Sequence, residues 1–272
     1  MPVIDAWVNP DMPRRPEPWQ RHVAEQLFKK PADQVFRRVP EDELLAVLDQ
    51  AGIDRAVLTL PHLPSPSRHV LQLCERHPRR FVLSVIVDPR GGYPQLCELK
   101  SLARNHPLHL VRLIPSMLGI APDHASCFPL YTLCCELGLA VSINTGFPPP
   151  GLPAALQDPM ALDPVCLYFP ELPVIMAHGA APWWPTACSL LQRHRQLYLM
   201  TSSYRPSKLP EVLLHHMQQR QHQHRVIFAS DFPFLDPARC LEEVPSLKLS
   251  PEARDAYLWG NAERLFFGPT DA

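Results

Sequence analysis

Two stretches of the sequence end an apolar run on a side chain that can exchange protons. VIMAHGAAPWW leads to His178, and VIFASDFPF leads to Asp231. Taken singly, His178 could be a strand-end histidine bonded to the backbone, and Asp231 could be the N-cap of a helix. A histidine and a carboxylate that face one cavity can instead act together as general acid and general base. We therefore expect His178 and Asp231 to be the catalytic residues.

The N-terminal run VIDAWVN, residues 3 to 9, carries a second polar pattern. Asp5, Trp7 and Asn9 have the spacing of an Asp-x-His-x-His metal motif in which both histidines are missing. The indole of Trp7 can donate its N–H but cannot ligate a metal ion. The pattern leaves open whether this segment is a metal site that has lost its ligands or a strand that never had one.

The alternation of apolar runs with helical patterns predicts the scaffold that positions these residues. The runs with strand character span residues 2–7, 55–60, 81–87, 108–114, 139–144, 173–178, 197–201 and 225–230. Helical periodicity covers residues 41–51, 66–77, 92–105, 128–138, 158–169, 184–195, 208–219 and 237–245. Eight such units predict an α/β fold, a (β/α)8 TIM barrel, as a single domain over residues 1–272. A doubly wound open sheet is the alternative, but VNPDMPRRPEP stands where that fold usually has a glycine-rich phosphate turn.

In a barrel, the residues at the C-terminal ends of the strands face the active site. Most positions at the predicted strand ends are polar: Asp5, Trp7, Asn9, His62, Arg112, Asn144, His178, residues 201–205 and Asp231. A long insertion at about residues 9–40 separates the first strand from its helix. Insertions of this kind lie on the same face of a barrel and often form part of the substrate pocket.

The same side chains indicate how a substrate would be bound. The amides of Asn9 and Asn144 could hold a carboxylate or carbonyl oxygen. Arg112, if its side chain points into the barrel, would supply a permanent positive charge. Flat apolar surface for an aromatic or cyclic ligand would come from the tryptophans Trp7, Trp183 and Trp184.

Composition and charge limit the partners of the chain. The formal net charge is −1, and no long block of like charges forms a footprint for nucleic acid. No apolar run approaches the roughly 18 residues that span a bilayer. Eight cysteines are scattered without a C-x-x-C pair, which favours buried thiols in a reducing compartment. We expect a cytoplasmic protein that binds a small-molecule substrate, with no nucleic acid and no membrane as partner.

The order of these motifs resembles that of the amidohydrolase-related family of (β/α)8 enzymes. The similar branch includes aminocarboxymuconate semialdehyde decarboxylase, resorcylate-type decarboxylases and some lactone hydrolases. The matching pieces are VIDAWVN, GLAVSINTGFPPPG, LPVIMAHGAAPWW, VIFASDFPF and WGNAERLF, which span residues 3 to 267. The resemblance implies a barrel fold, hydrolase or decarboxylase activity, and assembly as a homodimer.

The resemblance also implies a metal site that this chain has changed. Family members typically bind one divalent metal through two histidines of the first strand, a histidine ending the fifth and the aspartate after the eighth. Trp7, Asn9, Asn144 and Asp231 hold those places, and the acid/base histidine of the sixth strand matches His178. Neutral amide oxygens suit hard ions such as Mg²⁺ and are poor partners for zinc. We expect no tightly bound cofactor, and any weak divalent metal would use Asp231, His178, Asn9 and Asn144.

The sequence thus predicts an amidohydrolase-like enzyme, a hydrolase or decarboxylase acting on a small cyclic or aromatic carboxylate-type substrate with a degenerate metal site. Two alternatives stay open. One is a barrel that has lost catalysis and serves as a binding or scaffold protein. The other is a metal-dependent hydrolase with an atypical ligand set, to which His62 would be a candidate contributor.

Overall fold

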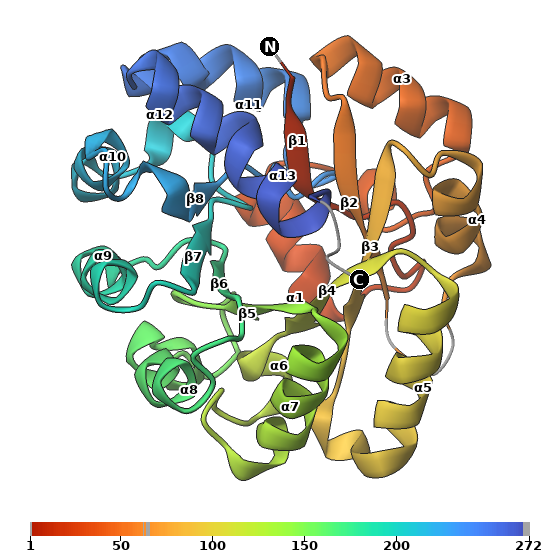
Figure 1. Cartoon of the computed structure of the whole chain (residues 1–272). Coiled ribbons are helices and arrows are strands. Elements are labelled where there is room, and N and C mark those ends of the chain that lie inside the picture. The colour runs from red at the N-terminus through yellow and green to blue at the C-terminus, as the bar shows by residue number, and fades with distance from the viewer. Residues whose placement is uncertain (1, 62, 64–65, 269–272) are drawn as a thin grey trace.

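The computed structural model describes residues 2–61, 63 and 66–268, and shows eight parallel strands in one sheet (Figure 1). His62, a predicted strand-end residue, lies outside the described residues. The strand order follows the chain order from first to last, as a (β/α)8 barrel requires. The strands are β1 (Ile4–Val8), β2 (Arg55–Leu60), β3 (Phe81–Ile86), β4 (Leu108–Leu113), β5 (Ala140–Asn144), β6 (Val174–Ala177), β7 (Leu197–Met200) and β8 (Val226–Ile227). The predicted TIM barrel is confirmed.

Helices surround the strands on the outside of the barrel (Figure 1). Those that follow the strands include α3 (Glu41–Ala51), α4 (Arg68–Arg76), α5 (Gly92–Asn105), α7 (Phe128–Leu137), α8 (Leu162–Tyr168), α9 (Trp184–Arg193), α10 (Glu211–Gln218) and α11 (Pro237–Glu243). The shorter helices are α1 (Pro18–His22), α2 (Ala32–Val35), α6 (Pro115–Leu118), α12 (Pro251–Asp255) and α13 (Asn261–Phe266). Among the described residues, no helix has the length and apolar content needed to cross a membrane.

The barrel interior changes from apolar to polar along the strands. An apolar layer joins inward side chains such as Ile4, Val57 and Ile175 to Phe266 of α13, which therefore closes the N-terminal end. Further along the strands, Ser84 and Arg112 are buried, and the guanidinium of Arg112 donates a hydrogen bond to the hydroxyl of Ser84. Because a barrel interior is a packed core and not a pore, the open space for a ligand lies beyond this polar layer.

The last strand is shorter than predicted, because the backbone after it leaves the regular ladder. The apolar run at 225–230 predicted six strand residues, but β8 covers only Val226–Ile227. The N–H of Phe228 donates to the carbonyl of Tyr257 at 3.1 Å and not to a neighbouring strand. The barrel still closes on β1, because Ala6 N donates to Phe228 O at 3.2 Å and Asp231 N donates to Trp7 O at 3.1 Å.

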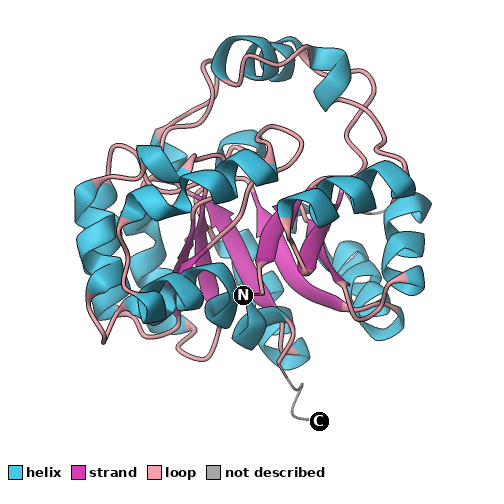
Figure 2. Cartoon of the chain, turned by 90° about the horizontal axis from the view of Figure 1, so that it is seen from above, coloured by secondary structure: helices cyan, strands magenta, loops and turns pink. Residues whose placement is uncertain are grey.

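The insertion after β1 forms a lid over one end of the barrel. It contains α1, a π-helical turn at Val23–Leu27, and α2. Ala24, Val35 and Phe36 form a small core of its own, on which Met12 and Phe234 pack. Figure 2 shows helices arching over the end of the barrel opposite the C-terminus. This segment, residues 10–40, is called the lid below.

Candidate active site

A cavity of about 1130 Å³ lies between the lid and the C-terminal ends of the strands. Its floor is formed by polar side chains that follow the strands, and its walls are largely apolar. The floor includes Trp7, Asn9, Asn144, His178, Ser203 and Asp231, and the walls include Met12, Val23, Leu27, Phe28, Met117, Phe147 and Phe234. The structure therefore brings together both predicted catalytic residues and three of the predicted substrate-binding residues.

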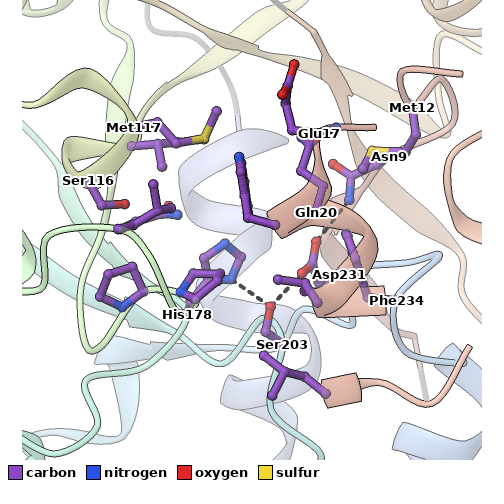
Figure 3. Close-up of a pocket in the computed structure, with 18 of the residues that line it drawn as sticks. Asn9, Met12, Glu17, Gln20, Ser116, Met117, His178, Ser203, Asp231 and Phe234 are labelled. Atoms are coloured by element: carbon purple, nitrogen blue, oxygen red, sulfur yellow. Dashed lines mark hydrogen bonds between the residues drawn. The ribbon is translucent and has the colours of Figure 1, made fainter. Parts of the chain in front are cut away.

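Ser203 connects the two predicted catalytic residues. Its Oγ donates to Asp231 Oδ2 at 2.5 Å and lies 3.1 Å from His178 Nδ1 (Figure 3). A hydroxyl has one hydrogen, so when it is donated to Asp231 the oxygen can accept only an N–H from His178 Nδ1. His178 Nε2 then carries a lone pair. The arrangement is a continuous hydrogen-bonded chain of imidazole, hydroxyl and carboxylate on the cavity floor.

The backbone at all three residues is in the left-handed region, which is unusual for residues other than glycine. The φ angles are 62° for His178, 66° for Ser203 and 64° for Asp231. Strained backbone of this kind persists only where surrounding contacts enforce it, and it concentrates at functional sites. Here the His178 N–H donates to Ser202 Oγ at 3.1 Å, which is one such contact.

Burial changes the proton affinity of both titratable groups. It raises the pKa of Asp231 to about 7, although hydrogen bonds from Ser203 and Asn9 oppose the rise. Burial, aided by the positive charge of Arg112, lowers the pKa of His178 to about 4. Near neutral pH the imidazole is therefore neutral, while Asp231 can both give and take a proton.

Arg112 was predicted to bind substrate, but the structure places it behind the cavity floor. Its side chain does point into the barrel, but it is fully buried and does not line the cavity. The guanidinium lies 3.4 Å from the centre of the Trp7 ring and donates to Ser84 Oγ at 2.8 Å and Ala6 O at 2.9 Å. Trp7 therefore separates the charge of Arg112 from the cavity.

Trp183 and Trp184 are also not among the residues that line the cavity, although both were predicted to contact substrate. Trp184 is buried, with its ring against the edge of Tyr204 at 5.2 Å between centroids and against Gly179, where a Cβ would meet it at 2.2 Å. Trp183 packs edge-on against Phe147. Trp184 is the first residue of α9, and its side chain is buried there.

Asn144 and Asn9 lie on the floor as predicted but differ in their hydrogen bonds. Asn9 accepts from Trp7 Nε1 at 2.9 Å and donates to Asp231 Oδ1 at 2.9 Å. Asn144 is 8% exposed, and its Oδ1 finds no hydrogen-bond partner among the described residues. A buried acceptor without a partner is costly, and Asn144 belongs to the cavity lining, so a ligand donor that reached its Oδ1 would satisfy it.

These residues do not fit the metal site that the sequence motif implies. The Asn9 oxygen accepts from the indole of Trp7, and its amide nitrogen points a donor at Asp231. Both oxygens of Asp231 accept hydrogen bonds, and a tryptophan stands at one of the ligand positions. Among the described residues, no group of three or more His, Cys, Asp or Glu side chains is placed to hold one ion. The floor is arranged for hydrogen bonding.

Asp5 lies behind the cavity floor and supports the segment that carries Asp231. It is buried and accepts from Ser230 N at 2.9 Å and from Ser230 Oγ at 2.5 Å, so it ties β1 to the segment that carries Asp231. Burial raises the pKa of Asp5 to about 6. Asp5 does not line the cavity, and it contacts Ser230, the residue before Asp231, so we expect it to position Asp231.

Ser203 is the functional residue that sequence reasoning did not single out. Its segment, residues 201–205, was predicted to follow a strand, but a serine in TSSYR carries no signal of its own. Ser203 differs from Ser202 because its hydroxyl joins the side chains of His178 and Asp231, which lie 25 and 28 positions away along the chain. Those contacts arise only when β6, β7 and β8 stand side by side.

We predict that Ser203→Ala lowers kcat/KM by about tenfold and raises the pH at which activity appears. The hydrogen bond from Ser203 lowers the pKa of Asp231, so its loss raises that pKa further above 7. A base is active only when ionised, so the acidic limb of the pH profile moves upward. Profiles of kcat/KM for wild type, Ser203→Ala and Ser203→Gly measure this shift.

Two comparisons make this test specific. Ser203→Gly lacks the hydroxyl but tolerates the positive φ, so equal shifts in both variants assign the effect to the hydroxyl. Ser207→Ala removes an exposed hydroxyl that donates to Glu243, and it should leave the profile unchanged. A wild-type profile in Ser203→Gly would contradict a role for Ser203 in the proton chain.

Known proteins are similar to this chain over nearly its whole length. The family model described as Amidohydrolase matches residues 4–268. No curated protein sequence matches the chain. The solved structure of an uncharacterised TIM-barrel protein from Bordetella bronchiseptica is similar with a TM-score of 0.78 and 21% identity, covering 97% of this chain and 98% of that one.

Two further similar structures are of proteins with a named activity. A 5-carboxyvanillate decarboxylase from Sphingomonas paucimobilis has a TM-score of 0.74 and 15% identity, covering 98% of this chain and 99% of that one. A probable 2-pyrone-4,6-dicarboxylic acid hydrolase from Acinetobacter baumannii has a TM-score of 0.68 and 16% identity, covering 98% and 100%. At these identities the likeness shows the fold alone.

Proposed function

The chain belongs to the amidohydrolase family, and from that premise we propose that it is an enzyme of the hydrolase or carboxy-lyase kind. Its substrate in this proposal is a small cyclic or aromatic molecule with a carboxylate-type group. The observation that carries the proposal is the hydrogen-bonded chain of Asp231, Ser203 and His178 on the floor of a large cavity. Similar structures that include a 5-carboxyvanillate decarboxylase and a probable 2-pyrone-4,6-dicarboxylic acid hydrolase support the same range of chemistry.

The charges around the cavity favour hydrolysis over decarboxylation. Asp231 brings negative charge to the floor, and Trp7 separates Arg112 from it. Among the described residues that line the cavity, Arg14 and Arg15 alone carry permanent positive charge, and both belong to the lid. A substrate carboxylate on the floor would face the ionised Asp231 and could not contact the guanidinium of Arg112, which does not line the cavity. A neutral ester, lactone or amide carbonyl meets no such repulsion.

In the proposed hydrolysis, Asp231 takes a proton from water while the water oxygen bonds to the carbonyl carbon. The proton then passes to the leaving oxygen or nitrogen as its bond to carbon breaks, which returns Asp231 to its ionised form. Neutral His178 orients the water by accepting a hydrogen bond at Nε2. The unpaired Asn144 Oδ1 would accept a hydrogen bond from an N–H or O–H of the substrate.

We further propose that this chemistry does not depend on a tightly bound metal. Protein dialysed against a chelator should contain far less than one zinc per chain by elemental analysis, and its turnover should match that of untreated protein. The test uses a panel of lactones, esters, amides and aromatic acids, with product release as the readout. Chelator-sensitive turnover with stoichiometric metal would show an atypical ligand set instead.

The same panel tests the class of function. Release of acid and alcohol or amine identifies hydrolysis, and release of carbon dioxide from the aromatic acids identifies decarboxylation. Thermal stabilisation by panel members without any turnover would overturn the enzymatic proposal and identify a binding or scaffold barrel.

A further inference from the structure

We propose that the substrate carries, beyond its reacting ring, an apolar extension that lies between the lid and the loops after β4 and β5. The inference rests on the proposed function in one respect: the reacting carbonyl end is placed on the polar floor. The extension then points away from Ser203 and Asp231 toward the open end of the cavity.

The first observation is where the large exposed apolar side chains gather. Leu27 of the lid, Met117 of α6 and Phe147 after β5 are 55%, 39% and 65% exposed, and all three line the cavity. They come from three separate segments of the chain and meet around one space. Exposed apolar side chains that converge on a concave surface mark a ligand-binding site, because removing their surface from water favours binding of a ligand.

The second observation is the volume. Ligand pockets usually measure about 300 to 1,000 Å³, and this cavity holds about 1130 Å³. A single ring with one carboxyl-type group would leave most of that space to water. The apolar walls would then stay hydrated, and the binding free energy that they offer would be unused.

The third observation is the separation of polar and apolar surface. The polar groups with unused hydrogen-bonding capacity, Asn144 Oδ1 and His178 Nε2, lie on the floor. Met117 lies on the far side of the cavity from Ser203 (Figure 3). A ligand that is polar at one end and apolar along the rest matches both surfaces at once, whereas a uniformly polar ligand leaves Leu27, Met117 and Phe147 without apolar contacts.

The probes that test this inference are 4-alkylbenzamides with methyl, propyl and pentyl chains, whose amide is a neutral head group. Equilibrium binding to the whole protein is measured by calorimetry. We expect affinity to rise about two- to fourfold for each added methylene, because each one covers apolar wall. Equal affinity for the methyl and pentyl compounds would overturn the inference.

Substitutions in the cavity wall test where the apolar extension of the ligand lies. Leu27→Ser and Met117→Ser should each weaken the pentyl compound by about fivefold and change the methyl compound less than twofold. Matched controls are Leu167→Ser and Met160→Ser, since these side chains are 60% and 51% exposed but lie away from the cavity. Similar weakening in the controls would show that the apolar contacts are not those of the cavity wall.

The binding measurement needs no turnover, so the two proposals can fail separately. If chain length controls affinity but no compound is ever turned over, the apolar extension stands and the enzymatic function falls. If the panel reveals turnover but affinity ignores chain length, the function stands and the extension falls.

Discussion

Asp231→Asn should lower kcat by about 10²- to 10⁴-fold, the range expected when a general base is removed. The amide keeps the size of the carboxyl group, and its oxygen can still accept the hydrogen bond from Asn9. It cannot take a proton from water. Steady-state kinetics on the best panel substrate measures the loss, and the melting temperature of the variant confirms that it is folded.

The control for this variant is Asp236→Asn. Asp236 is a nearby aspartate that caps α11 by accepting from Ala238 N at 2.9 Å and does not line the cavity. Its replacement should leave kcat within about twofold. Unchanged turnover in Asp231→Asn would exclude Asp231 as the base.

The raised pKa of Asp231 determines how the activity of the wild type should depend on pH. Asp231 acts as a base only when ionised, and burial raises its pKa to about 7. Activity should therefore be full above that pKa and fall as the pH drops through it. Because the pKa of His178 is lowered to about 4, its protonation does not account for a transition near neutral pH.

Trp7→Ala should lower the free energy of unfolding by about 3–5 kcal/mol, as for other buried tryptophans. The Trp7 side chain is 4% exposed, and its ring lies against the guanidinium of Arg112 and 4.5 Å from the His178 ring centre. Truncation removes the cation–π contact and leaves Asn9 Oδ1 without its donor. Chemical denaturation at constant protein concentration measures the loss.

The same change should reverse the charge preference of the cavity. With the indole gone, the charge of Arg112 faces the space that the floor borders, so a carboxylate head group gains a partner. Wild type should bind 4-methylbenzamide more tightly than 4-methylbenzoate, and Trp7→Ala should bind the benzoate more tightly.

A conservative variant, Trp7→Phe, tests the same contact between the ring and Arg112, and it can be studied even if Trp7→Ala is too unstable. Trp7→Phe keeps an aromatic ring over Arg112, so it should retain the amide preference while losing less stability. An unchanged ratio of the two affinities in Trp7→Ala, or a wild type that already prefers the benzoate, would show that Trp7 does not insulate Arg112.

Several elements were predictable because their signals are local. The predicted helix at 41–51 is α3, where Pro40 precedes the first residue and Gly52, with a φ of 73°, follows the last. The predicted helix at 92–105 is α5, and Pro107 follows shortly after its end. Such residues act on the backbone within one or two positions, so they need no tertiary contacts to be interpreted.

The sequence by itself determined the barrel, the face that carries the site, and the presence of His178, Asp231, Asn9 and Asn144 there. Apolar runs and helix boundaries depend on neighbouring residues, and parallel strands in chain order place their C-terminal ends on one face. The tertiary structure alone decided that Trp7 covers Arg112, that α9 buries Trp184, and that Ser203 joins His178 to Asp231. Those outcomes depend on side-chain packing between strands far apart in the chain, such as β1 and β4, and no local pattern of residue types encodes it.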